Sequence, residues 1–160
     1  MHKSDGEHPY GDIGQIIVLF IFFSVWITDS FILHTSTFLM DKISLIIRLS
    51  IMVFSLIPVF YLIRSGHQVV PRIRKTDNLV TTGAFRYVRH PLYLASLLTY
   101  FALSISTLSL FSMAIFVGIF ILHDYIASYE EKRLKMKYGE TYSLYRIKTG
   151  KWLPKISSTS

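Results

Sequence analysis

The sequence predicts an all-α, multi-pass membrane protein with four transmembrane helices, of which the third and fourth form a hairpin, followed by a cytoplasmic C-terminal helix. Three observations lead to this fold class. The 160 residues are 51% apolar and only 17% charged, with a mean hydropathy of +0.43. The apolar residues gather in long uncharged stretches, and most basic residues lie between or after them. A small soluble domain has too much surface for so few polar groups, so we expect one membrane-embedded domain over residues 1–160.

The first two spans are expected where apolar runs are long enough to cross a hydrocarbon core about 30 Å thick. The first run covers residues 13–27 and resumes at 31–33 after Asp29, and the second covers residues 43–63 and contains Arg48. Ionisable side chains are costly in such segments. Asp29 and Arg48 could pair across the two spans, and we interpret both as structural.

A helical hairpin is expected from residues 92–122. These 31 residues contain no Asp, Glu, Lys, Arg or His. As one helix they would be about 46 Å long, well beyond the roughly 30 Å of the core. We therefore expect a turn near residues 104–107, where Ser and Thr hydroxyls can cap the second helix.

Basic residues orient the chain. Eight of the 17 Lys and Arg residues follow Glu131, and six form an earlier cluster, Arg64, Arg72, Arg74, Lys75, Arg86 and Arg89. Because Lys and Arg favour the cytoplasmic side and a hairpin returns the chain to its starting face, both clusters and both termini are predicted to be cytoplasmic. The charges form collars at the membrane face and not a stripe along a groove, which argues against nucleic-acid binding. The chain length favours a prokaryotic plasma membrane.

Polar side chains converge at the cytoplasmic end of the predicted hairpin. Arg89, His90 and Tyr93 lie at the start of its first helix. Glu130 and Glu131 follow its second helix, about 12 Å beyond Leu122 if the helix continues. Because a hairpin brings its two ends together, we expect these five side chains to lie near one another.

The chemistry of this group favours a zwitterionic nucleoside as its ligand. A guanidinium and an imidazole suit a carboxylate or phosphate, and carboxylates suit ribose hydroxyls or an ammonium group. Gly83 allows the backbone to approach a ligand closely. A metal site is not expected, because the His and acidic residues lack the spacings typical of metal ligands.

Two motifs enclose these residues. They read Thr82-Gly83-x-Phe85-x-x-Val88-Arg89-His90-Pro91-x-Tyr93 and Glu130-Glu131-x-x-Leu134-x-x-x-Tyr138-Gly139-x-x-Tyr142-x-x-Tyr145. Together they resemble the integral-membrane methyltransferases, a group that includes isoprenylcysteine carboxyl methyltransferase and the phospholipid methyltransferases. The resemblance covers roughly residues 79–154, which it identifies as the cofactor-binding half of the domain.

The resemblance implies that S-adenosylmethionine is the cofactor and assigns residues to it. The cofactor-binding residues implied are Val80, Gly83, Arg89, His90, Pro91, Tyr93, Glu130, Glu131 and Tyr142. The basic and aromatic side chains, with backbone near Gly83, would contact its amino-acid and adenine portions, and the two glutamates its ribose and ammonium groups. Arg89, Tyr93 and Glu131 are the implied catalytic residues.

Other residues near the motifs have simpler interpretations. Tyr138, Tyr142 and Tyr145 fall on one helix face and would suit an aromatic belt at the headgroups, with Tyr142 as the exception that reaches the ligand. His123 and Asp124 are expected either to line the entrance for the acceptor or to have no such role.

The activity that the resemblance implies is methyl transfer to a lipophilic acceptor taken from the bilayer, either a prenylcysteine-like carboxylate or a lipid amine. His123 and Asp124 stand where the eukaryotic prenylcysteine enzymes have basic residues. Two alternatives stay open. One is an NADPH-dependent membrane reductase of sterol-reductase-like architecture, and the other is a non-enzymatic lipid-binding protein whose basic collars meet anionic lipids.

Overall fold

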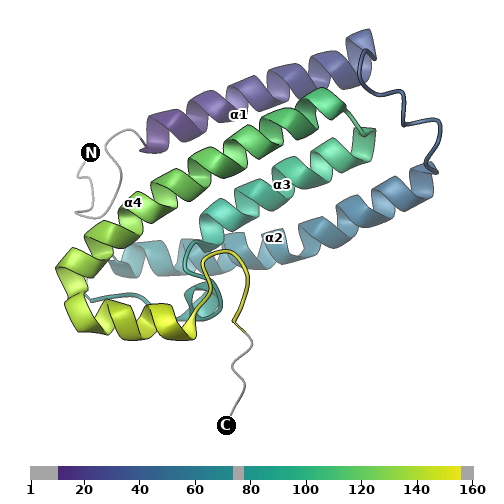
Figure 1. Cartoon of the computed structure of the whole chain (residues 1–160). Helices are drawn as coiled ribbons and strands as arrows, with labels where there is room; N and C mark the ends of the chain where they lie inside the picture. Colours follow the sequence, from purple (N-terminus) through teal and green to yellow (C-terminus); the bar gives the residue numbers. More distant parts are fainter. Residues whose placement is uncertain (1–10, 74–77, 156–160) are drawn as a thin grey trace.

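The computed structural model describes residues 11–73 and 78–155, and these are almost entirely helical (Figure 1). The elements are α1 (Gly11–Ile27), the π-helix η1 (Thr28–Leu33), α2 (Leu45–Ile73), the short 3-10 helix η2 (Gly83–Arg86), α3 (Pro91–Thr107) and α4 (Leu110–Lys148). The predicted all-α class is confirmed.

The four long helices lie side by side, with α4 between α1 and α3, and α2 packed along α3 (Figure 1). One buried cluster joins α1, α3 and α4 and comprises Phe22, Leu97, Tyr100 and Ile119. A second joins α2 and α3 to the segment between them and comprises Val59, Leu62, Ala84, Val88 and Ala95. The outer faces of α1 and α2 remain apolar, since Phe20 is 66% and Phe54 77% exposed, as contact with lipid tails requires.

Three described helices are long and apolar enough to cross a membrane, over Ile13–Leu33, Leu45–Gly66 and within Leu110–Lys148. The fourth expected span, α3, has 17 residues and is about 25 Å long, so it is the shortest of the set. Because α4 has 39 residues and about 20 suffice to cross the core, its C-terminal part, from about Glu130, extends beyond the span.

The expected hairpin is present, but its turn lies slightly later than predicted. Helix α3 ends at Thr107, Leu108 adopts a left-handed conformation with φ of 47°, and Ser109 caps α4 by accepting a hydrogen bond from the Ser112 amide at 3.1 Å. Residues 104–107 stay helical, and the hydroxyls of Ser106 and Thr107 bond to the Leu103 carbonyl within their own helix and do not cap the next one.

The two ionisable residues within the first two spans both bind the hairpin turn. Asp29 is buried and accepts hydrogen bonds from the Ser36 amide at 2.9 Å and from the Ser36 and Ser109 hydroxyls at 2.5 Å each. Buried Arg48 donates to the Ser106 carbonyl at 2.8 Å. No ion pair joins Asp29 and Arg48 in the described part of the chain, so the pairing that the sequence suggested is replaced by two separate contacts with one turn.

Helix α2 continues to Ile73, ten residues beyond the apolar run of residues 43–63 in which the second span was expected. The helix passes so close to the start of α3 that a Cβ atom on Gly66 would lie 2.4 Å from Leu92 Cδ2. Ser65 Oγ accepts a hydrogen bond from the Ala84 amide at 2.6 Å. These contacts hold the end of α2 against the segment that precedes α3. Arg74 and Lys75 of the first basic cluster lie outside the described residues.

Replacing Asp29 tests how much its contacts stabilise the hairpin. Asp29→Ala leaves buried donors of Ser36 and Ser109 unsatisfied, and we expect it to lower the free energy of unfolding by about 3 kcal/mol. Denaturant unfolding in mixed micelles measures this. Asp41→Ala, at an exposed position, is the control, and equal stability of the two variants would contradict a structural role for Asp29.

Candidate active site

The segment before α3 brings Arg89 and His90 to the end of the bundle. Gly83 begins η2 with a φ of 63°, which favours glycine, and the chain then pairs Val88 with Gly150 in a single parallel bridge. Pro91 begins α3, where its missing amide hydrogen costs nothing. Arg89 and His90 thus stand directly before the helix, beside the C-terminal residues of the chain.

Helix α4 brings the acidic residues to the same place. Its backbone breaks at Gly139, where φ is 54° and ψ is −120°, so the last part of the helix turns back toward the start of α3 (Figure 1). A positive φ is tolerated here because glycine has no Cβ. Tyr142 and Tyr145, which follow the bend, line the same pocket as Arg89.

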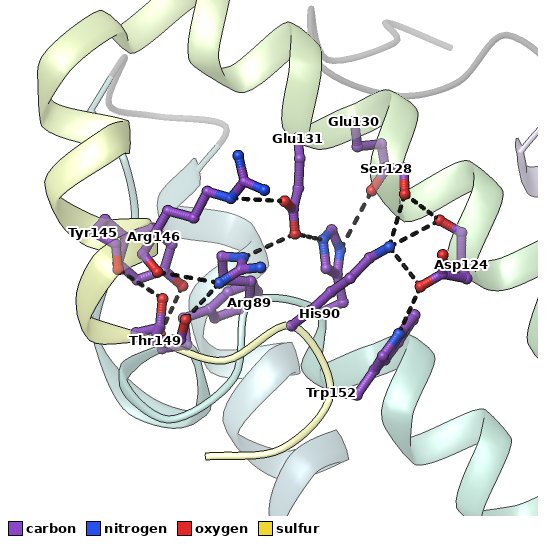
Figure 2. A network of polar contacts seen from close by, with 12 residues as sticks. Arg89, His90, Asp124, Ser128, Glu130, Glu131, Tyr145, Arg146, Thr149 and Trp152 are labelled. Carbon is purple, nitrogen blue, oxygen red and sulfur yellow. Dashed lines mark hydrogen bonds and ion pairs between the residues drawn. The ribbon is translucent and has the colours of Figure 1, made fainter. Parts of the chain in front are cut away.

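A buried ionic cluster centres on Glu131 (Figure 2). Its Oε1 accepts hydrogen bonds from Arg89 Nε at 2.8 Å and His90 Nε2 at 3.2 Å, and its Oε2 lies 3.7 Å from Arg146 Nε. The Arg89 guanidinium also donates to the carbonyl of Thr149. Glu131 is only 7% exposed, and a buried carboxylate needs such partners because its desolvation is costly.

A second polar group lies on the other side of His90. The Tyr93 hydroxyl donates to Glu130 Oε1 at 2.6 Å, and Glu130 Oε2 lies 3.7 Å from His90 Nδ1. The rings of His90 and Tyr93 stack with centroids 5.7 Å apart, and Tyr93 meets the His123 ring edge-on at 5.4 Å. His90 is therefore the bridge between the two glutamates.

The charge states in this cluster follow from its hydrogen bonds. Burial alone would raise the pKa of Glu131, but hydrogen bonds from His90 and Arg89 and the nearby guanidinium charge outweigh it and lower the pKa to about 2. Burial lowers the pKa of His90, although its bond with Glu131 acts in the opposite direction. At neutral pH Glu131 is ionised and His90 neutral. Because an ionised carboxylate only accepts, the proton of His90 is on Nε2 and its Nδ1 is free to accept.

A pocket opens beside this cluster. It is an open depression that encloses about 110 Å³, which is smaller than the roughly 300–1,000 Å³ of typical small-molecule sites. The lining residues are Asn78, Leu79, Val80, Phe85, Arg89, His90, Leu134, Tyr138, Tyr142 and Tyr145. The Tyr142 side chain is 1% exposed, and its hydroxyl has no hydrogen-bond partner among the described residues. A buried phenol of this kind normally has a partner, and Tyr142 is one of the residues that line the pocket.

The structure divides the predicted site residues into two groups. Val80, Arg89, His90 and Tyr142 line the pocket. The other five predicted residues do not line it, namely Gly83, Pro91, Tyr93, Glu130 and Glu131. The last three contact His90, which does line it.

One sequence interpretation needs correction. Tyr145 is buried, lines the pocket and donates its hydroxyl to the Phe85 carbonyl at 2.7 Å, so it is not part of an aromatic belt. The expected proximity of Glu131 to Arg89 and His90 is found.

Sequence reasoning missed the C-terminal contacts. Lys151 Nζ donates to Asp124 Oδ1 at 2.5 Å and Trp152 Nε1 donates to the same oxygen at 2.8 Å, as the close-up shows (Figure 2). Lys151 and Trp152 follow the last helix, and nothing in the sequence indicates that they contact Asp124, near the start of that helix's polar part. No group of three His, Asp or Glu side chains in the described ranges could hold a metal ion.

The fold and the site define an all-helical protein with membrane-crossing helices and a polar pocket at one end of the bundle. A family model of phospholipid methyltransferases matches residues 43–141. Since this is more than half of the 160 residues, the chain belongs to the phospholipid methyltransferase family, a family of methyltransferases that act on lipids. No curated protein and no solved structure gives a significant match.

The charge on Glu131 should make the free energy of unfolding depend on pH. Its pKa in the folded chain is about 2, below the ordinary 4.5, so its contribution is present above about pH 4.5 and is lost as pH falls toward 2. The full shift corresponds to about 3 kcal/mol. We expect Glu131→Gln to be less stable than the wild type at pH 7 and nearly as stable at pH 2.

Denaturant unfolding at several pH values between 2 and 7 checks this expectation. Glu140→Gln, on the exposed part of α4, serves as the control because it removes a carboxylate with no pairing to Arg89. A constant stability difference between wild type and Glu131→Gln at all pH values would contradict an ionised Glu131 in the folded state.

Proposed function

We propose that the chain transfers a methyl group from S-adenosylmethionine to a lipophilic acceptor at the cytoplasmic face of the membrane. The observation that carries the proposal is the pocket that Arg89 and His90, held by buried Glu131, line together with Tyr142, whose buried hydroxyl has no hydrogen-bond partner among the described residues. Membership of a methyltransferase family supports the reaction class.

The pocket has a donor set that suits this cofactor. Arg89 offers a cation for the carboxylate of the amino-acid portion, and Tyr142 offers a hydroxyl that lacks a partner in the described structure. Phe85, Tyr138 and Tyr145 give the pocket an aromatic lining that suits a purine ring. When bound, S-adenosylmethionine supplies a methyl group already activated by its sulfonium charge.

The main tasks of the protein are then alignment and exclusion of water. Proximity of two reactants contributes a large part of the rate of such transfers. Tyr93 and Glu130, on the side of His90 away from Glu131, are suited to orient the reacting end of an acceptor that arrives laterally between the helices.

The need for a base depends on the acceptor. A carboxylate acceptor is ionised at neutral pH and needs none, whereas an amine must lose a proton. Glu131 is a poor proton acceptor because its pKa is about 2. His90 is the better candidate, since neutral His90 exposes Nδ1 as an acceptor and Glu130 Oε2, 3.7 Å away, would stabilise its protonated form.

Calorimetric titration with S-adenosylhomocysteine tests the cofactor. We expect the purified protein to bind it saturably, and Arg89→Ala and Tyr142→Phe to weaken binding by about tenfold each, the cost of losing a hydrogen bond to a charged or buried group. Arg86→Ala, an exposed arginine on η2, should bind like the wild type. Failure of the folded wild type to bind in lipid-containing micelles would overturn the proposal.

Transfer of a labelled methyl group to two acceptors distinguishes the chemistries. If a phosphatidylethanolamine is the acceptor, His90→Gln should lower turnover by about a hundredfold, the usual size of a lost general base. If a prenylcysteine is the acceptor, the same variant should affect cofactor affinity more than turnover. His34→Gln, at the opposite end of the bundle, is the matched control, and an amine-dependent reaction unaffected by His90→Gln would exclude His90 as the base.

A further inference from the structure

The residues after α4 form a strap, Thr149 to Trp152, that crosses the end of the bundle beside the candidate active site. Lys151 Nζ donates to the Asp124 carbonyl at 3.0 Å, to Asp124 Oδ1 at 2.5 Å and to Ser128 Oγ at 2.8 Å. Trp152 Nε1 donates to the same carboxylate oxygen at 2.8 Å. Two consecutive residues of the strap are thus fastened to one carboxylate on α4.

The other side of the strap holds Arg89. The Arg89 amide donates to the Gly150 carbonyl at 2.9 Å, and its guanidinium donates to the Thr149 carbonyl. Thr149 is itself fixed, because its amide and its hydroxyl both donate to the Tyr145 carbonyl, at 3.1 and 2.8 Å. The guanidinium plane is therefore set by Glu131 on one edge and by backbone of the strap on another.

Trp152 extends the same contact to His90. Its ring lies 5.8 Å from the His90 ring and 5.9 Å from that of Phe120. With Tyr93 stacked on the imidazole at 5.7 Å, His90 is in contact with two aromatic rings, which restrict its orientation.

The turn that follows fixes the strap's direction. A Cβ atom on Gly150 would lie 1.6 Å from the Leu153 carbonyl oxygen, so the backbone folds too tightly there for any side chain. This turn sends Lys151 and Trp152 together toward Asp124, while the Gly150 carbonyl stays on the Arg89 amide. The contacts with Asp124 and the contact with the Arg89 amide are thereby linked through one short, closely packed segment.

We propose that Asp124, Lys151 and Trp152 are positioning residues, which clamp the strap so that it holds Arg89 and His90 in the geometry that the cofactor pocket needs. The inference rests on the proposed function. It assigns Asp124 to a support of the site in place of a surface for the acceptor, and it gives the C-terminal residues beyond the matched family region a part in cofactor binding.

The test compares cofactor affinity in Lys151→Met and Asp124→Asn with Lys148→Met, which removes an exposed lysine at the end of α4. We expect each of the first two variants to weaken binding of S-adenosylhomocysteine by about tenfold. The loss in the double variant should be smaller than the sum of the two single losses, because the two residues share the Lys151–Asp124 contact. The control should bind like the wild type.

The resonances of the His90 ring give a second measurement that does not require the cofactor. In histidine-labelled protein, with the signal assigned by His90→Gln, we expect Lys151→Met and Trp152→Phe to shift the His90 signals and Lys148→Met to leave them in place. Trp152→Phe keeps an aromatic ring beside His90 and removes the indole donor to Asp124, and it serves if another variant does not fold.

The outcomes separate the two proposals. Wild-type affinity together with unchanged His90 signals in Lys151→Met would overturn the positioning role. Additive losses in the double variant would also overturn it, since the residues would then act independently. If the wild type binds no S-adenosylhomocysteine, the proposed function fails, and the His90 signals alone then decide whether the strap positions the ring.

Discussion

The structure depends most on a buried carboxylate in contact with two basic side chains from a distant part of the sequence. Glu131 on α4 meets Arg89 and His90 before α3 at 2.8 and 3.2 Å. A carboxylate at this depth is stable only with such partners, so the two ends of the hairpin are required to meet. The same contact fixes the ionisation of Glu131 and the tautomer of His90, and it aligns Arg89 with the pocket. Packing and chemistry at this end of the bundle therefore share one interaction.

Much of this arrangement can be predicted from the sequence because it follows from lengths. A charge-free run of 31 residues is too long for one crossing, and the hairpin that results brings residues 89–93 to residues 130–131. The polar extension of α4 is predictable in the same way. The lengths of the helices do not indicate what a ligand does at these residues.

The remaining features depend on contacts that leave no pattern in the sequence. The end of α2 lies ten residues beyond its apolar run because Gly66 and Ser65 contact the segment near α3. The burial of Tyr145 depends on the bend at Gly139, where a single φ of 54° redirects the helix. Asp29 and Arg48 have the right charges to pair, yet hydroxyl and carbonyl groups of the hairpin turn are closer partners. Periodicity and charge predict the helices, whereas the side-chain geometry of the folded chain decides which polar groups bond to one another.

The contacts of Asp29 and Arg48 have a mechanical consequence for the hairpin. They tether its turn to η1 and α2, while Glu131 tethers its open end to the segment before α3. Because the hairpin is fastened at both ends, neither of its helices can slide along the other without breaking a buried polar contact. Piston-like signalling across the bilayer is thereby opposed. Motion that accompanies ligand exchange is therefore expected outside the hairpin and not as sliding of α3 along α4.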